Sequence, residues 1–296
     1  MNSARLRAEL ALAAVTVIWG WSFVIVKKAL EDLPTFLFLA LRFGVASFTL
    51  VLLFRGRLGQ HSHRWKETLR AGLVTGLCLA SGYFFQTAGL RYTTASKSAF
   101  LTGLTMAVVP FLAAAVSRKP PQLSELFGVA VAVTGMALLT LPPGTFSMAW
   151  GDTLTLGCTV AFAAHVVAVG YWSSRTAWEL LTLTQIFLTG LLSFVLAWGL
   201  EPMEAPWNLR IAGAVLFTGV LATAIPFSVQ CWAQSFTTPT RTALIFALEP
   251  VTAAVAAYFW AGERLSVRGW LGATLILCGV LLVELKPWRG RSHPLA

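Results

Sequence analysis

The sequence predicts an all-α polytopic membrane protein with ten transmembrane helices, arranged as two inverted repeats of five helices each. Three observations lead to this fold class: the composition, a series of long apolar runs, and an internal repeat. Of the 296 residues, 57% are hydrophobic and only 11% are charged, and the mean hydropathy is +0.73. So few polar residues cannot cover the surface of a water-soluble domain, and we therefore expect the chain to lie in a bilayer.

The apolar residues form long runs instead of alternating with polar ones. A helix needs about 20 predominantly apolar residues to cross the hydrocarbon core, whereas the strands of a membrane barrel alternate over about ten residues. Because backbone groups in lipid must be paired within the chain, these runs predict helices. The predicted spans are residues 9–30, 34–54, 68–90, 94–117, 121–141, 150–172, 178–200, 208–236, 239–261 and 265–285.

Two segments, 93–141 and 237–285, align without a gap at a constant offset of 144 residues. Chance similarity between apolar segments accounts for matched leucines and alanines, but it does not account for matched threonines, basic residues and glycines. These pairs are Thr93 with Thr237, Lys97 with Arg241, Gly128 with Gly272, and Gly135 with Gly279. We therefore predict a tandem duplication, with one repeat in residues 1–145 and the second in residues 146–296.

Five spans per repeat make the second repeat enter the membrane in the opposite sense to the first. Inverted repeats are the architecture of secondary transporters, in which a site near the midplane faces each side of the membrane in turn. The duplication therefore predicts transport by alternating access.

Lysine and arginine in the short connections gather on the side of the predicted N-terminus. By the positive-inside rule, both termini are expected in the cytoplasm. The formal net charge of +10 follows the same bias, so we assign it to topology and to contact with anionic lipid, and we expect no nucleic-acid partner.

Several short motifs identify a family. The segments Ile18–Phe23 and Leu248–Pro250, the pair Arg42 and Phe43, and the turn Gly262–Leu265 resemble the EamA family of the drug/metabolite transporter superfamily, and the resemblance covers the whole chain. Within that family the chain resembles amino-acid exporters of the YddG type. The resemblance implies ten transmembrane helices, an inverted duplication, and export of small metabolites across a bacterial inner membrane.

Ionisable side chains inside an apolar span are costly, and each is therefore a candidate for function. Arg42, Lys97, His165 and Glu249 are such residues. In a substrate site, Arg42 would attract a carboxylate and Glu249 would orient an amine, whereas the structural alternative is that these two neutralise each other. For Lys97 the alternative is a side chain that reaches water at the span's end, and for His165 it is a hydrogen bond made in packing.

Aromatic and amide side chains within the spans suggest the wall of a binding pocket. Trp19, Tyr83, Gln230 and Trp232 are predicted to line it, because an apolar pocket with few polar groups suits a small metabolite. The alternative for the aromatic residues is packing or contact with lipid.

Three prolines lie inside predicted spans. Pro110, Pro226 and Pro250 each remove one helical hydrogen bond and favour a kink. We predict that they act as hinges during alternating access.

Covalent chemistry is not expected. The four cysteines are isolated, His61 and His63 have no nearby cysteine or carboxylate pair, and no nucleotide-binding loop is present, so the sequence predicts neither a metal site, a cofactor nor an enzyme. The alternatives are an exporter of hydrophobic or cationic drugs, in which Glu249 and the aromatic residues make the main contacts, and a membrane enzyme that acts on lipid-linked substrates. Substrate, coupling to protons and oligomeric state, a monomer included, stay open.

Overall fold

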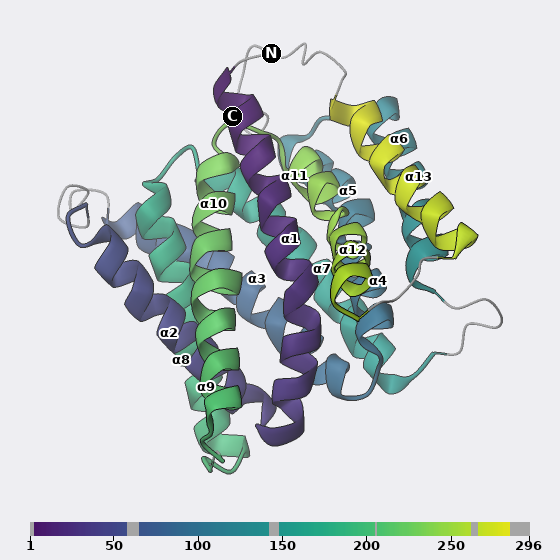
Figure 1. Cartoon of the computed structure of the whole chain (residues 1–296). Coiled ribbons are helices and arrows are strands. Elements are labelled where there is room, and N and C mark those ends of the chain that lie inside the picture. Colours follow the sequence, from purple (N-terminus) through teal and green to yellow (C-terminus); the bar gives the residue numbers. More distant parts are fainter. Residues whose placement is uncertain (1–2, 58–64, 142–147, 205, 262–265, 285–296) are drawn as a thin grey trace.

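Long apolar helices follow one another along nearly the whole chain in the computed structural model (Figure 1), which describes residues 3–57, 65–141, 148–204, 206–261 and 266–284. Within these residues, eight helical stretches are long and apolar enough to cross a membrane, and two of them, Ser96–Ser117 and Leu209–Ala233, combine adjoining helices. The repeat boundary expected at residues 145 and 146, and also His61 and His63, lie outside the described residues. The helices are α1 (Ser3–Asp32), α2 (Thr35–Phe54), α3 (Trp65–Arg91), α4 (Ala95–Gly103), α5 (Thr105–Ser117), α6 (Leu123–Thr140), α7 (Trp150–Trp172), α8 (Trp178–Leu200), α9 (Leu209–Leu216), the π-helix η2 (Phe217–Ala224), α10 (Ile225–Ala233), α11 (Pro239–Phe246), α12 (Glu249–Ala261) and α13 (Val267–Glu284).

The predicted span 94–117 is divided into α4 and α5. Helix α4 ends at Gly103, a residue that weakens helices, and the N–H of Leu104 donates to the carbonyls of both Phe100 and Leu101 at 3.2 Å. The interruption therefore lies at Leu104, whereas Pro110, which was expected to interrupt the span, lies inside α5.

The predicted span 239–261 is likewise divided, into α11 and α12. Pro250 has no N–H and cannot bond to the carbonyl of Phe246, four residues earlier, and α11 ends at Phe246. Glu249 is consequently the first residue of α12. Neither helix alone has the length of a full membrane span.

The predicted span 208–236 is continuous, but its middle third is wound as the π-helix η2. The N–H of Ile225 donates to the carbonyl of Val220, five residues back. Pro226 follows in the first turn of α10, and π-helical turns of this kind occur at functional sites.

Corresponding helices have matching bounds. Helices α5 and α12 each have 13 residues, and α6 and α13 each have 18. In both pairs the second helix begins 144 residues after the first, which is the offset of the sequence repeat.

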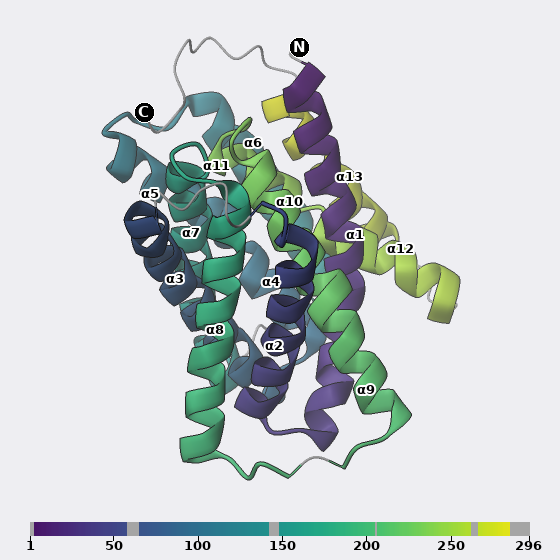
Figure 2. The same cartoon turned by 90° about the vertical axis from the view of Figure 1, so that its left-hand side faces the viewer.

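Helices α6 and α13 run antiparallel side by side (Figures 1 and 2), and glycines let their backbones touch. A Cβ atom at Gly135 would lie 2.6 Å from the carbonyl oxygen of Gly272, and one at Gly128 would lie 2.9 Å from that of Gly279. The glycine pairs of the sequence repeat therefore meet crosswise at this interface, where small residues permit close approach.

A buried cluster of charges joins α1 to α11. Glu9 accepts hydrogen bonds at Oε1 from Arg5 Nε at 2.6 Å and from Thr237 Oγ1 at 3.1 Å. Arg241 Nη1 lies 3.6 Å from the same oxygen. All four side chains are buried, so the cluster fastens the starts of these two helices together.

A second cluster joins α7 to α4 in the same manner. Asp152 is fully buried; its Oδ2 lies 3.0 Å from Lys97 Nζ, and its Oδ1 accepts a hydrogen bond from Thr93. Thr93 and Lys97 correspond in the sequence repeat to Thr237 and Arg241 of the first cluster. Each cluster thus ties the fourth predicted span of one repeat to the first predicted span of the other.

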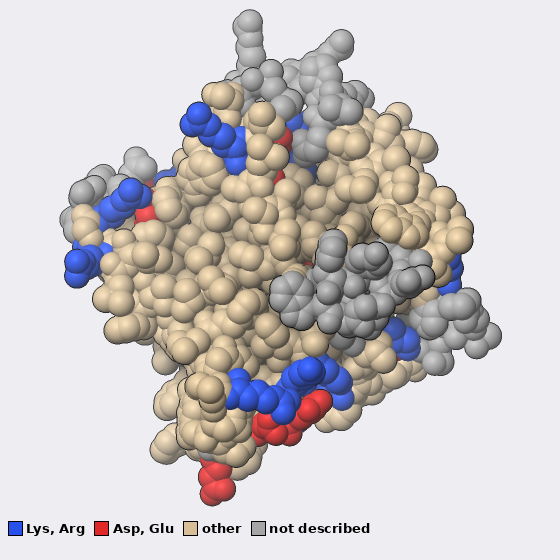
Figure 3. All heavy atoms as spheres, in the orientation of Figure 1, with Lys and Arg blue, Asp and Glu red and all other residues tan. Residues whose placement is uncertain are grey.

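Charged side chains on the face drawn in Figure 3 lie toward the edges of the view and leave an uncharged band between them. In the first turn of α9, Arg210 forms exposed ion pairs with Glu31 at 3.4 Å and Asp32 at 3.7 Å. Large apolar side chains such as Phe48 and Trp198 are exposed. A lipid-facing belt with charged rims has this distribution.

The glycine contact generates a prediction about stability. Gly135→Ala should lower the free energy of unfolding by about 1–3 kcal/mol, because the added methyl group meets the backbone of α13. Gly44→Ala is the matched control, since a Cβ there meets nothing within 4 Å; its stability should be unchanged or slightly higher. Thermal unfolding of the purified variants in detergent measures both. Equal melting temperatures would contradict the close contact.

Candidate functional site

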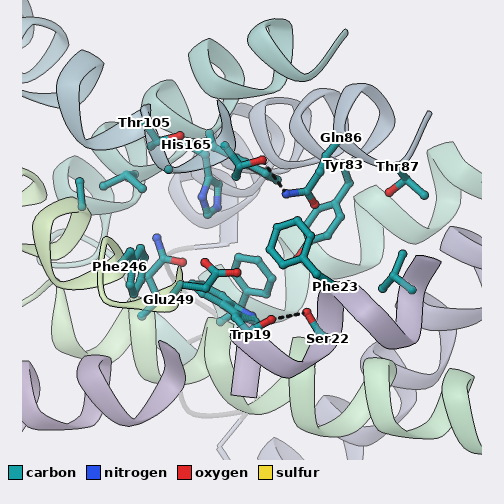
Figure 4. Close-up of a pocket in the computed structure, with 18 of the residues that line it drawn as sticks. Trp19, Ser22, Phe23, Tyr83, Gln86, Thr87, Thr105, His165, Phe246 and Glu249 are labelled. Carbon is teal, nitrogen blue, oxygen red and sulfur yellow. Dashed lines mark hydrogen bonds between the residues drawn. The ribbon is translucent and has the colours of Figure 1, made fainter. Parts of the chain in front are cut away.

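A cavity lies between the helices, and its empty volume, with the open solvent at its mouth included, is about 850 Å³. Apolar side chains form most of its wall, and a small number of polar groups point inward (Figure 4). Its lining residues are Trp19, Ser22, Phe23, Val26, Arg42, Tyr83, Gln86, Thr87, Leu90, Thr102, Gly103, Thr105, Phe162, His165, Val166, Phe227, Gln230, Ala243, Phe246, Ala247 and Glu249.

Most of the predicted site residues line this one cavity, although they come from six different helices. They are Trp19, Arg42, Tyr83, His165, Gln230 and Glu249. Lys97 and Trp232 are not among its lining residues.

Arg42 is almost fully buried, and neutral oxygens hold its guanidinium. Its Nε donates to Thr223 Oγ1 at 2.7 Å, and its Nη2 donates to Tyr83 Oη and to the carbonyl of Ala222, both at 3.1 Å. The guanidinium also lies 4.7 Å from the ring centre of Tyr83, a cation–π distance. None of these partners carries a negative charge, so the positive charge of Arg42 is not neutralised by them.

Glu249 presents a carboxylate to the same cavity from the first turn of α12. In the part of the chain that the structure describes, this carboxylate forms neither an ion pair nor a hydrogen bond. The expected alternative, in which Arg42 and Glu249 neutralise each other, is therefore not the arrangement in this structure. One cavity therefore contains both ionisable side chains, and they do not pair with each other.

His165 is held by a hydrogen bond to Gln185 of α8. Its Nε2 lies 2.9 Å from Gln185 Oε1, while Gln185 Nε2 donates to Cys231 Sγ at 3.1 Å. Because the amide oxygen of Gln185 is the acceptor, Nε2 of His165 carries a proton and the neutral ring has its acceptor at Nδ1. Figure 4 shows the His165 ring and the Glu249 carboxylate turned toward the middle of the cavity.

Amide side chains close one end of the cavity. Gln230 Nε2 donates to Gln234 Oε1 at 3.0 Å, and Gln234 Nε2 donates to the carbonyl of Val166 at 2.9 Å. These bonds join α10 to α7. In the opposite direction the lining continues to Val26 and Leu90, next to the ends of α1 and α3, so the cavity extends toward that end of the bundle.

Aromatic rings form a continuous wall around Trp19. The ring centre of Trp19 lies 4.8 Å from that of Phe246 and 5.7 Å from that of Phe227, and Tyr83 lies 5.3 Å from Phe162. The three phenylalanines were not predicted as site residues. Phenylalanines that face lipid have the same spacing along apolar runs. The sequence therefore does not distinguish a phenylalanine that lines the cavity from one that faces lipid.

Lys97 and Trp232 have other partners. Lys97 pairs with Asp152, a residue 55 positions away whose proximity could not be read from the sequence. Trp232 packs in a separate apolar cluster and contacts the ring of Phe236 at 5.6 Å. Among the described residues, no group of three or more histidine, cysteine, aspartate or glutamate residues is suited to hold a metal ion.

Known proteins resemble the chain over nearly its full length. A model of the EamA-like transporter family matches it twice, at residues 6–141 and 149–285. An uncharacterized transporter of Archaeoglobus fulgidus is 30% identical over 282 residues, which cover 95% of this chain and 87% of that protein. The uncharacterized transporter YoaV of Bacillus subtilis is 22% identical over 290 residues, which cover 93% and 96%.

A protein of known crystal structure has the same arrangement of helices. The two chains superimpose with a TM-score of 0.78 over 94% of this chain and 96% of the other, at 18% sequence identity. At this identity, the similarity demonstrates a common fold.

The position of Lys97 generates a prediction. Lys97→Met should lower the free energy of unfolding by about 2 kcal/mol, because the buried Asp152 loses its charged partner, while ligand affinity of the folded protein should not change. Lys97→Arg is the control that keeps the charge. Melting temperature and ligand binding, measured on the same preparations, separate the two effects. A loss of affinity at unchanged melting temperature would place Lys97 in the binding site.

Proposed function

The chain belongs to the EamA-like transporter family, and we propose that its substrate is a small zwitterion, an amino acid (aromatic ones included) or a related metabolite, exported by alternating access. The family and the apolar helices make it a multi-pass membrane transporter of small molecules and not an enzyme. The observation that carries the proposed substrate class is that an arginine and a glutamate line one cavity without pairing with each other.

Arg42 and Glu249 suit the two ends of a zwitterion. Both line the cavity, and neither is neutralised by a described residue. A charge in a water-poor site is unfavourable without a counter-charge, and a molecule with a carboxylate and an ammonium group supplies both counter-charges. A cationic drug would pair with Glu249 only and would leave the charge of Arg42 without a partner.

The rest of the cavity wall suits an apolar or aromatic side chain. The ring of Trp19 contacts those of Phe227 and Phe246, and such walls give a small ligand most of its buried contact area. Gln230 and His165 add neutral polar groups that could orient the ligand.

Alternating access is supported by the internal symmetry. The paired helix bounds, the crosswise glycine contacts and the interruptions at Leu104 and at Ala247–Leu248 are all related by the offset of the sequence repeat. Discontinuous helices that flank a central site are typical of inverted-repeat transporters. In this proposal, Pro226 acts as a hinge next to the π-helix of the continuous span 208–236, and Pro250 acts as a hinge in the divided span 239–261.

The orientation follows from the distribution of basic residues. We place both termini in the cytoplasm at a bacterial inner membrane, because lysine and arginine are concentrated in the connections on that side. In that orientation the cavity extends outward past Val26 and Leu90, and the Glu9 cluster lies at the cytoplasmic end.

Counterflow in liposomes tests the substrate class. The wild-type protein should exchange an amino acid better than either half-analogue, the amine without the carboxylate or the acid without the amine. Arg42→Gln should lower amino-acid uptake roughly tenfold or more and abolish the preference over the amine, because a charged hydrogen bond contributes about 1.5–3 kcal/mol. Glu249→Gln should abolish the preference over the acid.

The matched controls are Arg210→Gln and Glu31→Gln, whose side chains are exposed and lie outside the cavity. Both should retain wild-type uptake. Better uptake of a hydrophobic cation than of any amino acid would favour the drug exporter. Unchanged uptake by the Arg42 and Glu249 variants would reject the assigned site.

A further inference from the structure

The π-helix η2 supplies the two oxygens that fix the guanidinium of Arg42 from behind the cavity wall. Thr223 Oγ1 accepts from Nε at 2.7 Å, and the carbonyl of Ala222 accepts from Nη2 at 3.1 Å. Thr223 is fully buried and does not line the cavity, so a ligand would be affected by it only through Arg42.

The carbonyl of Ala222 lies four residues before Pro226. In a regular α-helix this carbonyl would accept from the N–H of residue 226, which proline lacks. In this structure it accepts from two side chains, Arg42 Nη2 and Trp19 Nε1, the latter at 3.0 Å. One irregular turn therefore orients two residues of the cavity wall.

A ligand would bind to the N–H groups of Arg42 that form no hydrogen bond within the protein. The bonds to Thr223, Ala222 and Tyr83 occupy Nε and Nη2, whereas Nη1 forms no hydrogen bond to any residue for which the structure gives a position. An arginine side chain has about 2 kcal/mol of rotamer entropy to lose when it binds. A guanidinium that is already fixed loses less of it, which is the advantage of a preorganised site.

We propose that Thr223, together with the carbonyl that Pro226 leaves free, positions Arg42 for a substrate carboxylate and so determines the selectivity for carboxylate-bearing substrates. This inference rests on the proposed function. It assigns Thr223 and Pro226 as positioning residues, and it gives Pro226 a role that does not depend on helix motion.

The test compares binding of the amino acid and of its decarboxylated amine by purified variants. Thr223→Val keeps the shape of the side chain but removes the acceptor. Its affinity for the amino acid should fall roughly tenfold, the change expected for one hydrogen bond to a charged group, and its affinity for the amine should not change. Thr223→Ser keeps an acceptor and should restore the selectivity.

Thr218→Val is the matched control within η2, because the Thr218 hydroxyl is equally buried but donates to the carbonyl of Ala214 at 2.7 Å. It should bind both ligands as the wild type does. Pro226→Ala provides a second variant: its new N–H competes for the carbonyl of Ala222, and the loss should again be confined to the amino acid.

The results of these variants either support or overturn the positioning role of Thr223 and Pro226. If Arg42→Gln abolishes the selectivity while Thr223→Val and Pro226→Ala keep it, the positioning role is wrong and the proposed function stands. Equal losses for both ligands would indicate a purely structural role and would also overturn it. If the wild type does not prefer the amino acid to the amine, the proposed function fails, and this inference fails with it.

Discussion

Backbone carbonyls inside a bilayer must find their hydrogen-bond donors within the protein, because lipid offers none. The site of this chain is built where regular helix bonding fails to meet that requirement. Pro226 lacks the N–H that would bond to the carbonyl of Ala222 in a regular α-helix, and the side chains of Trp19 and Arg42 donate to that carbonyl. At Pro250 the same constraint ends α11 and places Glu249 at the start of a new helix. Both charges of the cavity are therefore positioned by proline.

The same requirement explains why few polar side chains line the cavity and why most of them form hydrogen bonds to other residues of the protein. His165 is held by Gln185, and Gln230 is held by Gln234, so these side chains are fixed before a ligand arrives. Glu249 differs, because its carboxylate has no partner among the described residues. A membrane protein retains such an expensive group where it has a function, and this contrast is the physical basis of the proposed substrate class.

The sequence predicted an all-helical membrane protein, because about 20 apolar residues have one stable form in lipid. Of the ten predicted spans, eight are long and apolar enough to cross a membrane within the described residues. The sequence also placed Arg42, His165 and Glu249 in one cavity, since costly polar side chains turn inward. It failed for Lys97, whose partner Asp152 is distant in the chain, and for Trp232, because the sequence does not specify which way an aromatic ring faces. Nothing in the sequence marks Thr223 as a residue of the site. It is a small hydroxyl residue in an apolar run, and its proposed role depends on the π-helix in which it lies.

The two buried charge clusters also constrain the order in which the protein is assembled. Glu9 is paired with Arg241 and Thr237, so the first helix is synthesised long before the partners of its buried carboxylate exist. Until the ribosome has passed residue 241, the start of α1 must keep Glu9 near water or near Arg5, four residues earlier. Asp152 meets no such delay, because Thr93 and Lys97 precede it. Two contacts that are alike in the finished protein thus become possible at different stages of biosynthesis, one once residue 152 has been made and the other only after residue 241.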